Sequence, residues 1–472
     1  MPLLAASSLQ AQSGAAPSSK PNVVFILADD LGWSDLGCYG ADLHETPHID
    51  QLARQGVRFT DAYAMSVCSP TRAMLMTGKH AARLHITIWA EGAREPGPKK
   101  RALLQAESFP DLAHGEKTMA EYLHAQGYLT ALVGKWHLGD ADHFPETHGF
   151  DVNIGGTHWG APQTFFWPYS GVGRYGSEFR YVPHLEFGHP GEYLTDRLTD
   201  EAIRVIDHAG AQPFFLYLAH HAPHTPIEAK EEDIQHFEAK LKPGLHHQNA
   251  VYAGMVKCLD DSVGRVLAHL KEKGLDKNTI VIFASDNGGY IGTDKQSGQK
   301  VPVTNNAPLR SGKGALYEGG IRVPLIVHWP GVTEQGAASA EPVQLGDLFY
   351  TILAAAGIPK PAEQPDDGLD LRPVLSHTKA HLARDAIFFH YPHYYETTTP
   401  VGAVRSGDWK LLEYFENHRT ELYNLKDDLG EQKDLSGQNP ERTAVLLQRL
   451  HAWRDEVKAA MPTPNPDYHG KK

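Results

Sequence analysis

Short, continuously apolar runs recur along the chain, and they predict buried β-strands. The runs are NVVFILA (22–28), YLTALVG (128–134), PFFLYLA (213–219), TIVIFAS (279–285) and VPLIVHW (323–329). Because polar residues do not alternate within them, both faces of each strand should be covered, as in a parallel sheet between helices. Ligands bind such sheets at the carboxyl ends of the strands, so side chains that follow these runs are the first candidates for chemistry.

Helical patterns lie between the apolar runs. Thr46 stands before a proline and predicts a helix N-cap, while Thr118 and Glu121 predict a capping box for a helix that ends at Gly127. Residues 248–274 form an amphipathic helix pattern, with apolar positions three or four residues apart at Val251, Met255, Leu259, Val263, Val266 and Leu270. This alternation predicts an α/β fold with a large, mainly parallel or mixed sheet sandwiched by helices.

The chain divides into three predicted parts. Residues 1–20 are rich in small residues and predict the remnant of an export signal or a linker, which favours a periplasmic or secreted protein. A flexible tail of a cytosolic protein is the alternative. Residues 21–380 form the α/β domain. Residues 381–472 predict a small, packed α+β subdomain with a short antiparallel sheet and a final helix at about 441–459.

Charge and cysteine content narrow the possible functions. The 472 residues include 44 basic and 57 acidic side chains, a net charge of −13 that disfavours nucleic acid as a partner. An acidic protein that acts on an anionic ester needs a local cation, which points to a bound metal. Three cysteines cannot form a disulfide framework, and the lack of an apolar stretch of about 18 residues predicts no membrane span.

Two strand ends deliver oxygen ligands. Asp29 and Asp30 follow the run at 22–28, and Asp286 and Asn287 follow the run at 279–285. Adjacent carboxylates repel unless a cation joins them, and hard oxygen donors with loose geometry favour Ca²⁺ over softer metals. Solvated turn residues are the alternative reading of either pair alone.

Cys68 begins the run Cys-Ser-Pro-Thr-Arg, which is followed by the helical pattern AMLMTG. The proline places Cys68 at a helix N-terminus, where backbone N–H groups and the dipole favour anions. A thiol there is expected to have a lowered pKa and to be a nucleophile. A buried, inert cysteine is the alternative.

The C-x-P-x-R run at 68–72 resembles the signature of the type I, formylglycine-dependent sulfatases of the alkaline phosphatase superfamily. Further segments agree in order and spacing from about residue 21 to about residue 457. They are PNVVFILADDLG, GKWHLG, AHHAPH, ASDNGG, RSGKGALYEGGIRVP, GAVRSGDWKLLEYF and ELYNLKDD. The resemblance implies an alkaline phosphatase-like fold, a sulfuric ester hydrolase, and oxidation of Cys68 to Cα-formylglycine by a separate maturation enzyme.

The resemblance also implies a role for each matching residue. One Ca²⁺ is held by Asp29, Asp30, Asp286 and Asn287, together with an oxygen of the modified residue 68. Arg72 positions the hydrated aldehyde, His137 faces its diol, and Lys135 and Lys313 bind the sulfate. Fixed cations of this kind stabilise a transferring sulfuryl group.

One histidine remains to be chosen from AHHAPHTP. His221 is predicted to be catalytic and to contact substrate, His224 is the second choice as a substrate contact, and His220 is expected to be a packing residue. No catalytic role is expected for His44, His80, His85, His148 or His158.

The implied mechanism uses both hydroxyls of the aldehyde hydrate. Asp286 takes a proton from one hydroxyl, whose oxygen attacks sulfur, and His221 protonates the departing alcohol. His137 then removes the proton of the second hydroxyl, so that sulfate is expelled and the aldehyde returns.

A sulfated carbohydrate is the expected substrate. Aromatic and histidine-rich segments around Trp159, Trp167 and His393 suit contacts with a sugar, although they equally suit a loop core. The basic segment 92–107 is either a contact for an anionic polymer or a solvated loop. Two alternatives stay open, namely a phosphonate monoester or phosphodiester hydrolase of the same superfamily and a noncatalytic glycan-binding protein. The sequence does not predict the sugar, the sulfate position, whether the enzyme acts at chain ends or within polymers, or the oligomeric state.

Overall fold

The five apolar runs are five neighbouring strands of one nine-stranded sheet in the computed structural model, which describes residues 20–95 and 97–469. The predicted signal remnant or linker at 1–20 therefore lies outside the described residues, except for Lys20. Across the sheet the strands are β11 (Ala337–Ser339), β2 (Val57–Tyr63), β10 (Arg322–His328), β9 (Thr279–Ser285), β1 (Asn22–Ala28), β8 (Phe214–Ala219), β4 (Leu129–Gly134) and β5 (Val152–Ile154), with β12 (Val343–Gln344) beside β2.

The sheet is mainly parallel, as predicted. Strands β9, β1, β8, β4 and β5 pair in parallel, whereas β10 is antiparallel to both β9 and β2. The run at 323–329 thus belongs to the sheet but runs against its neighbours. As a result, the segment that enters β10 reaches the same edge of the sheet as the segments that leave β1, β8 and β9.

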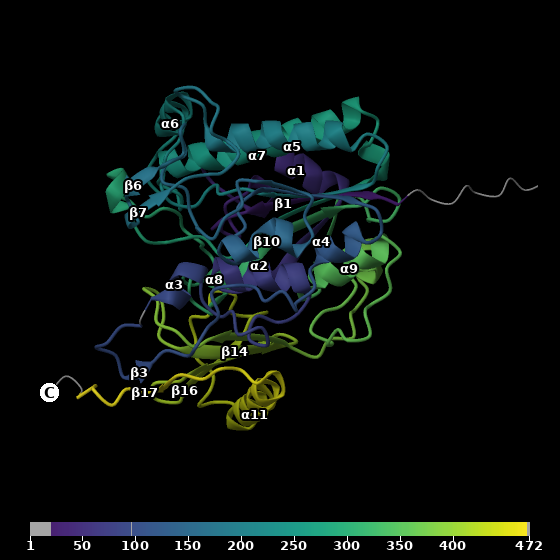
Figure 1. The fold of residues 1–472 in the computed structure, drawn as a ribbon. Coiled ribbons are helices and arrows are strands. Elements are labelled where there is room, and N and C mark those ends of the chain that lie inside the picture. Colours follow the sequence, from purple (N-terminus) through teal and green to yellow (C-terminus); the bar gives the residue numbers. More distant parts are fainter. Residues whose placement is uncertain (1–19, 96, 470–472) are drawn as a thin grey trace, which may run out of the picture.

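Both faces of the central strands are covered, which confirms the prediction made from the continuously apolar runs. In β1, Val23, Phe25 and Leu27 join one core, and the residues between them join a second core on the other face. Figure 1 shows the two helical layers. One layer contains α1 (Pro47–Gln55), α5 (Leu194–Ala209) and α7 (Ala250–Glu272), and the other contains α2 (Cys68–Thr77), α4 (Met119–His124), α8 (Glu318–Ile321) and α9 (Asp347–Ala355).

The helix ends agree only partly with the predictions. The capping box of Thr118 and Glu121 is present, but α4 ends at His124 and not at Gly127, and α7 occupies Ala250–Glu272 within the predicted amphipathic segment 248–274. Thr46 does precede α1, but its side chain makes no capping hydrogen bond. Instead, the carboxylate of Asp260 in α7 accepts hydrogen bonds from the backbone N–H groups of residues 48 and 49, at 3.1 and 2.8 Å. Helix α1 is therefore capped by a neighbouring helix.

The C-terminal region forms a four-stranded antiparallel sheet and a long helix, in the order β13 (Ile387–Tyr391), β14 (Val401–Ser406), β15 (Trp409–Tyr414), β16 (Arg419–Asn424) and α11 (Pro440–Val457). Helix α11 packs on one face of this sheet, with Leu446, Leu450 and Trp453 in the shared core. The other face joins the core of the main sheet, so the two parts are packed together (Figure 1).

The remaining elements are short. They are α3 (Ala90–Arg94), α6 (Glu231–Glu238), α10 (Arg372–Ser376), the strand pair β3 (Leu103–Leu104) and β17 (Thr463–Pro464), and the hairpin of β6 (Gly171–Gly173) and β7 (Gly176–Arg180). Among the described residues, no helix has the length and hydropathy needed to cross a bilayer.

Candidate active site

Strand register aligns the predicted site residues at one edge of the sheet. Ala28 pairs with Ser285, and Gly134 pairs with Ala219, so β1, β9, β4 and β8 end at the same level. The residues that follow β1, β9 and β4 are Asp29, Asp286 and Lys135, respectively. These side chains are fully buried.

Three carboxylates meet three cations at this edge. Asp29 Oδ2 lies 2.6 Å from Lys135 Nζ. Asp30 Oδ1 lies 2.7 Å from Lys313 Nζ, which the reversed direction of β10 brings to the site. Asp286 Oδ2 accepts hydrogen bonds from Nε and one terminal nitrogen of Arg72 at 2.9 and 2.7 Å. We call these six residues the site cluster.

Two buried oxygens in this region have no hydrogen-bond partner among the described residues. They are Oδ1 of Asp29 and Oδ1 of Asn287. In addition, ligand atoms of Asp29, Asp30, Cys68 and His224 lie within 4.8 Å of one another. Burial raises the pKa of the Asp29 carboxyl to about 8, and Lys135 opposes this only in part. A hard divalent cation fits this site, because it binds oxygen donors that have no other partner. Its charge also offsets the cost of ionising a buried carboxylate.

The backbone is strained at two of the predicted site residues. Asp30 has φ of 64° and His137 has φ of 61°, the left-handed region that side chains other than glycine rarely adopt. Each such residue costs on the order of 1–3 kcal/mol and persists where the surroundings fix it. Here the strain turns both side chains toward the charged edge of the sheet.

Cys68 occupies the first residue of α2, as predicted, but its thiol differs from the prediction. The side chain is buried, and burial raises the pKa of the thiol to about 12, although Lys135 and Lys313 oppose the shift. The expected lowering of the thiol pKa by the helix N-terminus is therefore wrong, because loss of hydration outweighs the dipole. The unmodified thiol stays protonated near pH 7 and is a poor nucleophile.

His137 is held by a residue that the sequence reasoning missed. Its Nε2 lies 2.6 Å from Glu91 Oε2, while Nδ1 has no partner among the described residues. Burial lowers the pKa of His137 to about 4, so the ring is neutral at pH 7. With its proton on Nε2 toward Glu91, the ring keeps a free lone pair at Nδ1. The separation of Glu91 from His137 along the sequence leaves no spacing signal that could have revealed the pair.

The three histidines after β8 have distinct surroundings. His220 Nε2 contacts Ser262 Oγ at 2.9 Å, which agrees with a packing role. His221 is buried, and neither of its ring nitrogens has a partner among the described residues. His224 Nε2 lies 3.1 Å from Lys313 Nζ, and its Nδ1 lies 2.7 Å from the carbonyl oxygen of Thr225. The geometry thus favours His224, the second choice, over His221 for contact with substrate.

A cavity of about 360 Å³ opens over Cys68. His224 belongs to its lining, while His221 is absent from the lining residues in the described part of the chain. The full lining is Cys68, Trp89, Glu91, Glu95, His137, Gly160, Ala161, Tyr175, Arg180, His224, Lys313 and Tyr395. The cavity therefore brings aromatic rings and charged groups together around the predicted nucleophile position.

The aromatic residues of the cavity are not those named from the sequence. Trp89, Tyr175 and Tyr395 line it, whereas Trp159 packs against Tyr181. His393 is fully buried, and its Nε2 lies 2.8 Å from Thr87 Oγ1. Trp167 and His393 are not among the lining residues that the structure describes. The segment around His393 nevertheless reaches the cavity through its neighbour Tyr395.

Family models and known relatives match nearly the whole chain. A model described as sulfatase matches residues 21–358, and one described as N-sulphoglucosamine sulphohydrolase, C-terminal, matches residues 312–458. A sulfatase from Formosa agariphila is 33% identical, with 98% of this chain and 92% of the relative covered. An N-acetylgalactosamine-6-sulfatase from Rattus norvegicus is 34% identical, with 89% of this chain and 76% of the relative covered.

Solved structures show the same likeness. The structure of Ps i-CgsB in complex with k-i-k-neocarrahexaose superposes with a TM-score of 0.77 and 30% identity, and 96% of each chain is covered. The PsFucS1 sulfatase from Pseudoalteromonas sp. gives a TM-score of 0.71 and 25% identity, with 95% of this chain and 92% of that chain covered.

Proposed function

The chain belongs to the sulfatase family and is a sulfuric ester hydrolase, and from this premise we propose that it removes sulfate from a sulfated carbohydrate with one Ca²⁺ and a formylglycine formed from Cys68. The observation that carries the proposal is the site cluster beneath the cavity. Lys135 and Lys313 of this cluster lie near the Cys68 thiol, and two buried oxygens, of Asp29 in the cluster and of Asn287 beside it, have no hydrogen-bond partner among the described residues.

The donors for the cation are oxygens of Asp29, Asp30, Asp286 and Asn287. A bound Ca²⁺ supplies positive charge that lets these carboxylates stay ionised side by side and polarises an oxygen placed on residue 68. The ammonium groups of Lys135 and Lys313 then remain available to the sulfate oxygens. We assign them to the stabilisation of the charge that develops on the transferring group.

A formylglycine hydrate supplies two hydroxyl groups on one carbon, one to attack sulfur and one whose loss of a proton releases sulfate. The protein positions this carbon by placing residue 68 at the start of α2, one turn from Arg72. The Arg72 guanidinium donates to Asp286 and to the carbonyl oxygen of Lys135, so it fixes both neighbours. Burial opposes ionisation of Asp286, but Arg72 and Lys135 outweigh it and lower its pKa, which keeps a carboxylate ready to accept a proton.

Two histidines complete the proton transfers. His137 lines the cavity and offers a neutral ring with a free Nδ1, which suits the removal of a proton from the second hydroxyl. His224 accepts from the Lys313 ammonium at 3.1 Å, so this pair provides a proton source beside the leaving oxygen. We therefore assign protonation of the departing alcohol to His224 with Lys313, in place of His221.

The shape and lining of the cavity support a sugar substrate. Trp89, Tyr175 and Tyr395 present aromatic faces, while Glu95 and Arg180 offer polar contacts at the same opening. Relatives of this chain are named for N-acetylgalactosamine-6-sulfate hydrolysis, and Ps i-CgsB was crystallised with a neocarrahexaose. A glycan is therefore the favoured class, although relatives also include steryl-sulfatases.

One further partner and a cellular location follow from this proposal. A maturation enzyme must oxidise Cys68, and it must act before the residue is buried, since the thiol is 2% exposed in the folded chain. We also keep the proposal of a periplasmic or secreted location, which rests on the composition of residues 1–20.

The proposal is tested by mass spectrometry and sulfate release on the same sample. Protein coexpressed with a formylglycine-generating enzyme is digested, and the peptide that contains residue 68 is weighed, while the intact protein is incubated with sulfated mono- and oligosaccharides. Conversion of the thiol to the aldehyde together with sulfate release supports the proposal. A converted residue with turnover of an aryl phosphonate but of no sulfate ester would instead favour the phosphonate hydrolase alternative.

The Cys68→Ala variant is the matched control. It keeps the site cluster and the four side chains proposed to hold Ca²⁺, but it cannot be converted to formylglycine. Sulfate release by this variant at the wild-type rate would contradict the assigned nucleophile.

A further inference from the structure

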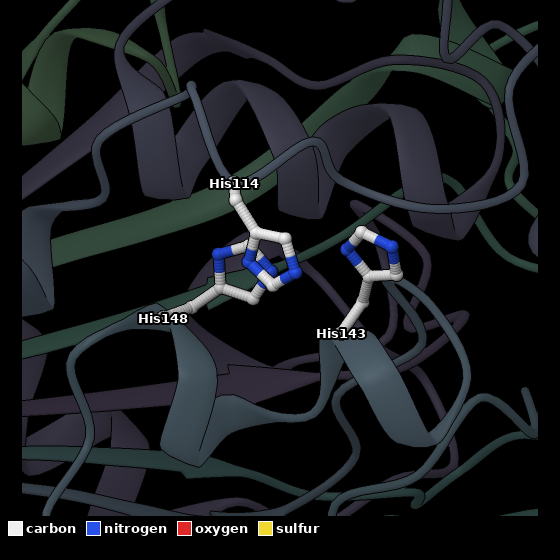
Figure 2. Close-up of side chains that lie close together, drawn as sticks. All are labelled: His114, His143 and His148. Carbon is white, nitrogen blue, oxygen red and sulfur yellow. The ribbon is translucent and has the colours of Figure 1, made fainter.

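Three histidines form a cluster separate from the site cluster. His114 lies in the loop before α4, His143 ends the 3-10 helix η2 (Ala141–His143), and His148 ends the 3-10 helix η3 (Pro145–His148). In Figure 2 the His114 and His148 rings overlap and the His143 ring stands beside them, and one ring nitrogen of each residue lies within 4.8 Å of the others. The ring of His114 stacks on that of His143 at a centroid distance of 4.4 Å.

Hydrogen bonds fix which nitrogens are free. His143 Nδ1 lies 2.8 Å from the carbonyl oxygen of Leu112, so Nδ1 carries the proton and Nε2 keeps its lone pair. A backbone carbonyl on the second ring nitrogen is the usual support of a histidine that binds a metal. His148 is 1% exposed, and its Nε2 has no hydrogen-bond partner among the described residues. A buried nitrogen without a partner is costly, so it calls for a ligand.

The donor chemistry of this cluster differs from that of the site cluster. All three members are imidazoles, and no carboxylate belongs to the group. Imidazole nitrogens select Zn²⁺, Cu²⁺ or Ni²⁺, whereas Ca²⁺ requires oxygen donors. Ring stacking alone satisfies the packing of the three histidines, but it leaves Nε2 of His148 without a partner among the described residues.

We propose that His114, His143 and His148 bind one divalent transition-metal ion, with Zn²⁺ as the first choice. Three histidines and a water complete a tetrahedral site. His114 is exposed, so an ion can enter from solvent and the His114 ring can turn its edge toward the ion. His148 provides the buried end of the site.

The position of this cluster suggests what the ion does. Trp136, between Lys135 and His137, donates its indole N–H to the carbonyl oxygen of His143 at 2.8 Å. The backbone N–H of Leu112 donates to the carbonyl oxygen of Leu138 at 2.8 Å. An ion that binds the three histidines would therefore stabilise the loop that carries Lys135 and His137. It is assigned a structural role, since its ligands do not line the cavity over Cys68 in the described chain.

Calorimetric titration of the full chain with Zn²⁺ tests the site. The protein is first stripped with a chelator that is selective for transition metals, and the buffer contains Ca²⁺ throughout so that the oxygen site is filled. We expect binding of one Zn²⁺ per chain, and slower hydrogen exchange in residues 135–149 once Zn²⁺ is bound. The His114→Ala variant, which alters an exposed side chain, should bind at least roughly tenfold more weakly, the lower bound seen when a partner of a ligating histidine is lost.

Two control variants separate this site from other sources of zinc binding. His208→Ala removes an exposed histidine of α5, and Asp30→Asn alters the site cluster, so both should bind Zn²⁺ as the wild type does. Tetrahedral Co²⁺ absorption from the wild type, lost in His143→Ala, is the second measurement. The proposal is overturned if the wild type binds no Zn²⁺ in Ca²⁺ buffer, if His114→Ala binds equally well, or if Asp30→Asn abolishes binding.

Discussion

Two buried groups of charged residues in this protein have the same composition and opposite surroundings. The site cluster contains three carboxylates and three cations. A second group, which we call the interface cluster, also contains three of each, and it joins the main sheet to the C-terminal sheet. Its members are Asp61, Glu318, Glu431, Arg322, Arg405 and Lys410.

The interface cluster is closed. Glu318 lies 2.6 Å from Arg322 and 2.8 Å from Lys410, and Lys410 lies 2.8 Å from Glu431. Asp61 lies 2.9 Å from Arg322, so each carboxylate has an opposite charge in contact. In the site cluster, Oδ1 of Asp29 has no hydrogen-bond partner in the described part of the chain, and ligand atoms of Asp29 and Asp30 converge with those of Cys68 and His224. The interface cluster also borders a cavity, of about 720 Å³, through Asp61, Arg322 and Arg405, but no such convergence of ligand atoms is found there among the described residues. The comparison teaches that converging ligand atoms, and neither buried charge nor a neighbouring cavity, mark the functional group.

The largest expected effect is a loss of stability, without a loss of activity, when a cation of the interface cluster is removed. Lys410→Met leaves Glu318 and Glu431 without the cation they share, and breaking a buried pair costs about 3–5 kcal/mol. The free energy of unfolding, measured by denaturant titration, should fall by that amount. Sulfate release per folded molecule should stay close to that of the wild type. Loss of activity without loss of stability would break the comparison.

The matching change in the site cluster also breaks a buried pair, but it should add a loss of turnover that Lys410→Met does not show. Lys135→Met removes an ammonium from the sulfate position, and loss of one such donor costs about 10²–10³-fold in kcat. Asp286→Asn is expected to reduce turnover similarly, because it removes the proton acceptor. Steady-state sulfate release and the denaturation midpoint of both variants check this. Full turnover by either variant in matured protein would contradict the assigned roles.

Removal of Ca²⁺ should act on the site cluster alone. A ligand at 100 times its Kd stabilises the folded state by about 2.7 kcal/mol, so chelation should lower the melting temperature and stop turnover. Asn287→Ala should weaken this response, because one oxygen donor is lost. Lys410→Met should show the same drop on chelation as the wild type, measured from its own lower starting point.

The smallest effect is a pH dependence within the interface cluster. Burial raises the pKa of Glu431 to about 7, although Lys410 opposes the shift. A raised carboxyl pKa means that the folded state binds the proton more tightly, so its stability falls as the pH rises from about 4.5 to about 7. Glu431→Gln removes this loss. Between about pH 5 and about pH 8 the variant should gain about 1–3 kcal/mol relative to the wild type.

The strands, and the edge of the sheet that carries the site, could be predicted from the sequence. Continuously apolar runs and the residues that follow them are local features of the chain. The direction of β10 could not be predicted, since an apolar run carries no information on strand polarity. The thiol pKa of Cys68 depends on how completely the folded chain buries it. The role of Glu91 could not be predicted, because its partner His137 is distant in the sequence. The choice between His221 and His224 depends on the path of the turn after β8.

The C-terminal part also completes the active site. Tyr395 lines the cavity, and Thr397 donates its hydroxyl to the carbonyl oxygen of Lys313 at 2.7 Å. Five residues after Lys313, Glu318 depends on Lys410 of the C-terminal sheet. A recombinant fragment that stops at residue 380 would thus lack one wall of the cavity, and Glu318 would keep Arg322 but lose Lys410 as a partner. The main sheet and the C-terminal part therefore build the active site together, and neither can be exchanged between relatives as an independent module.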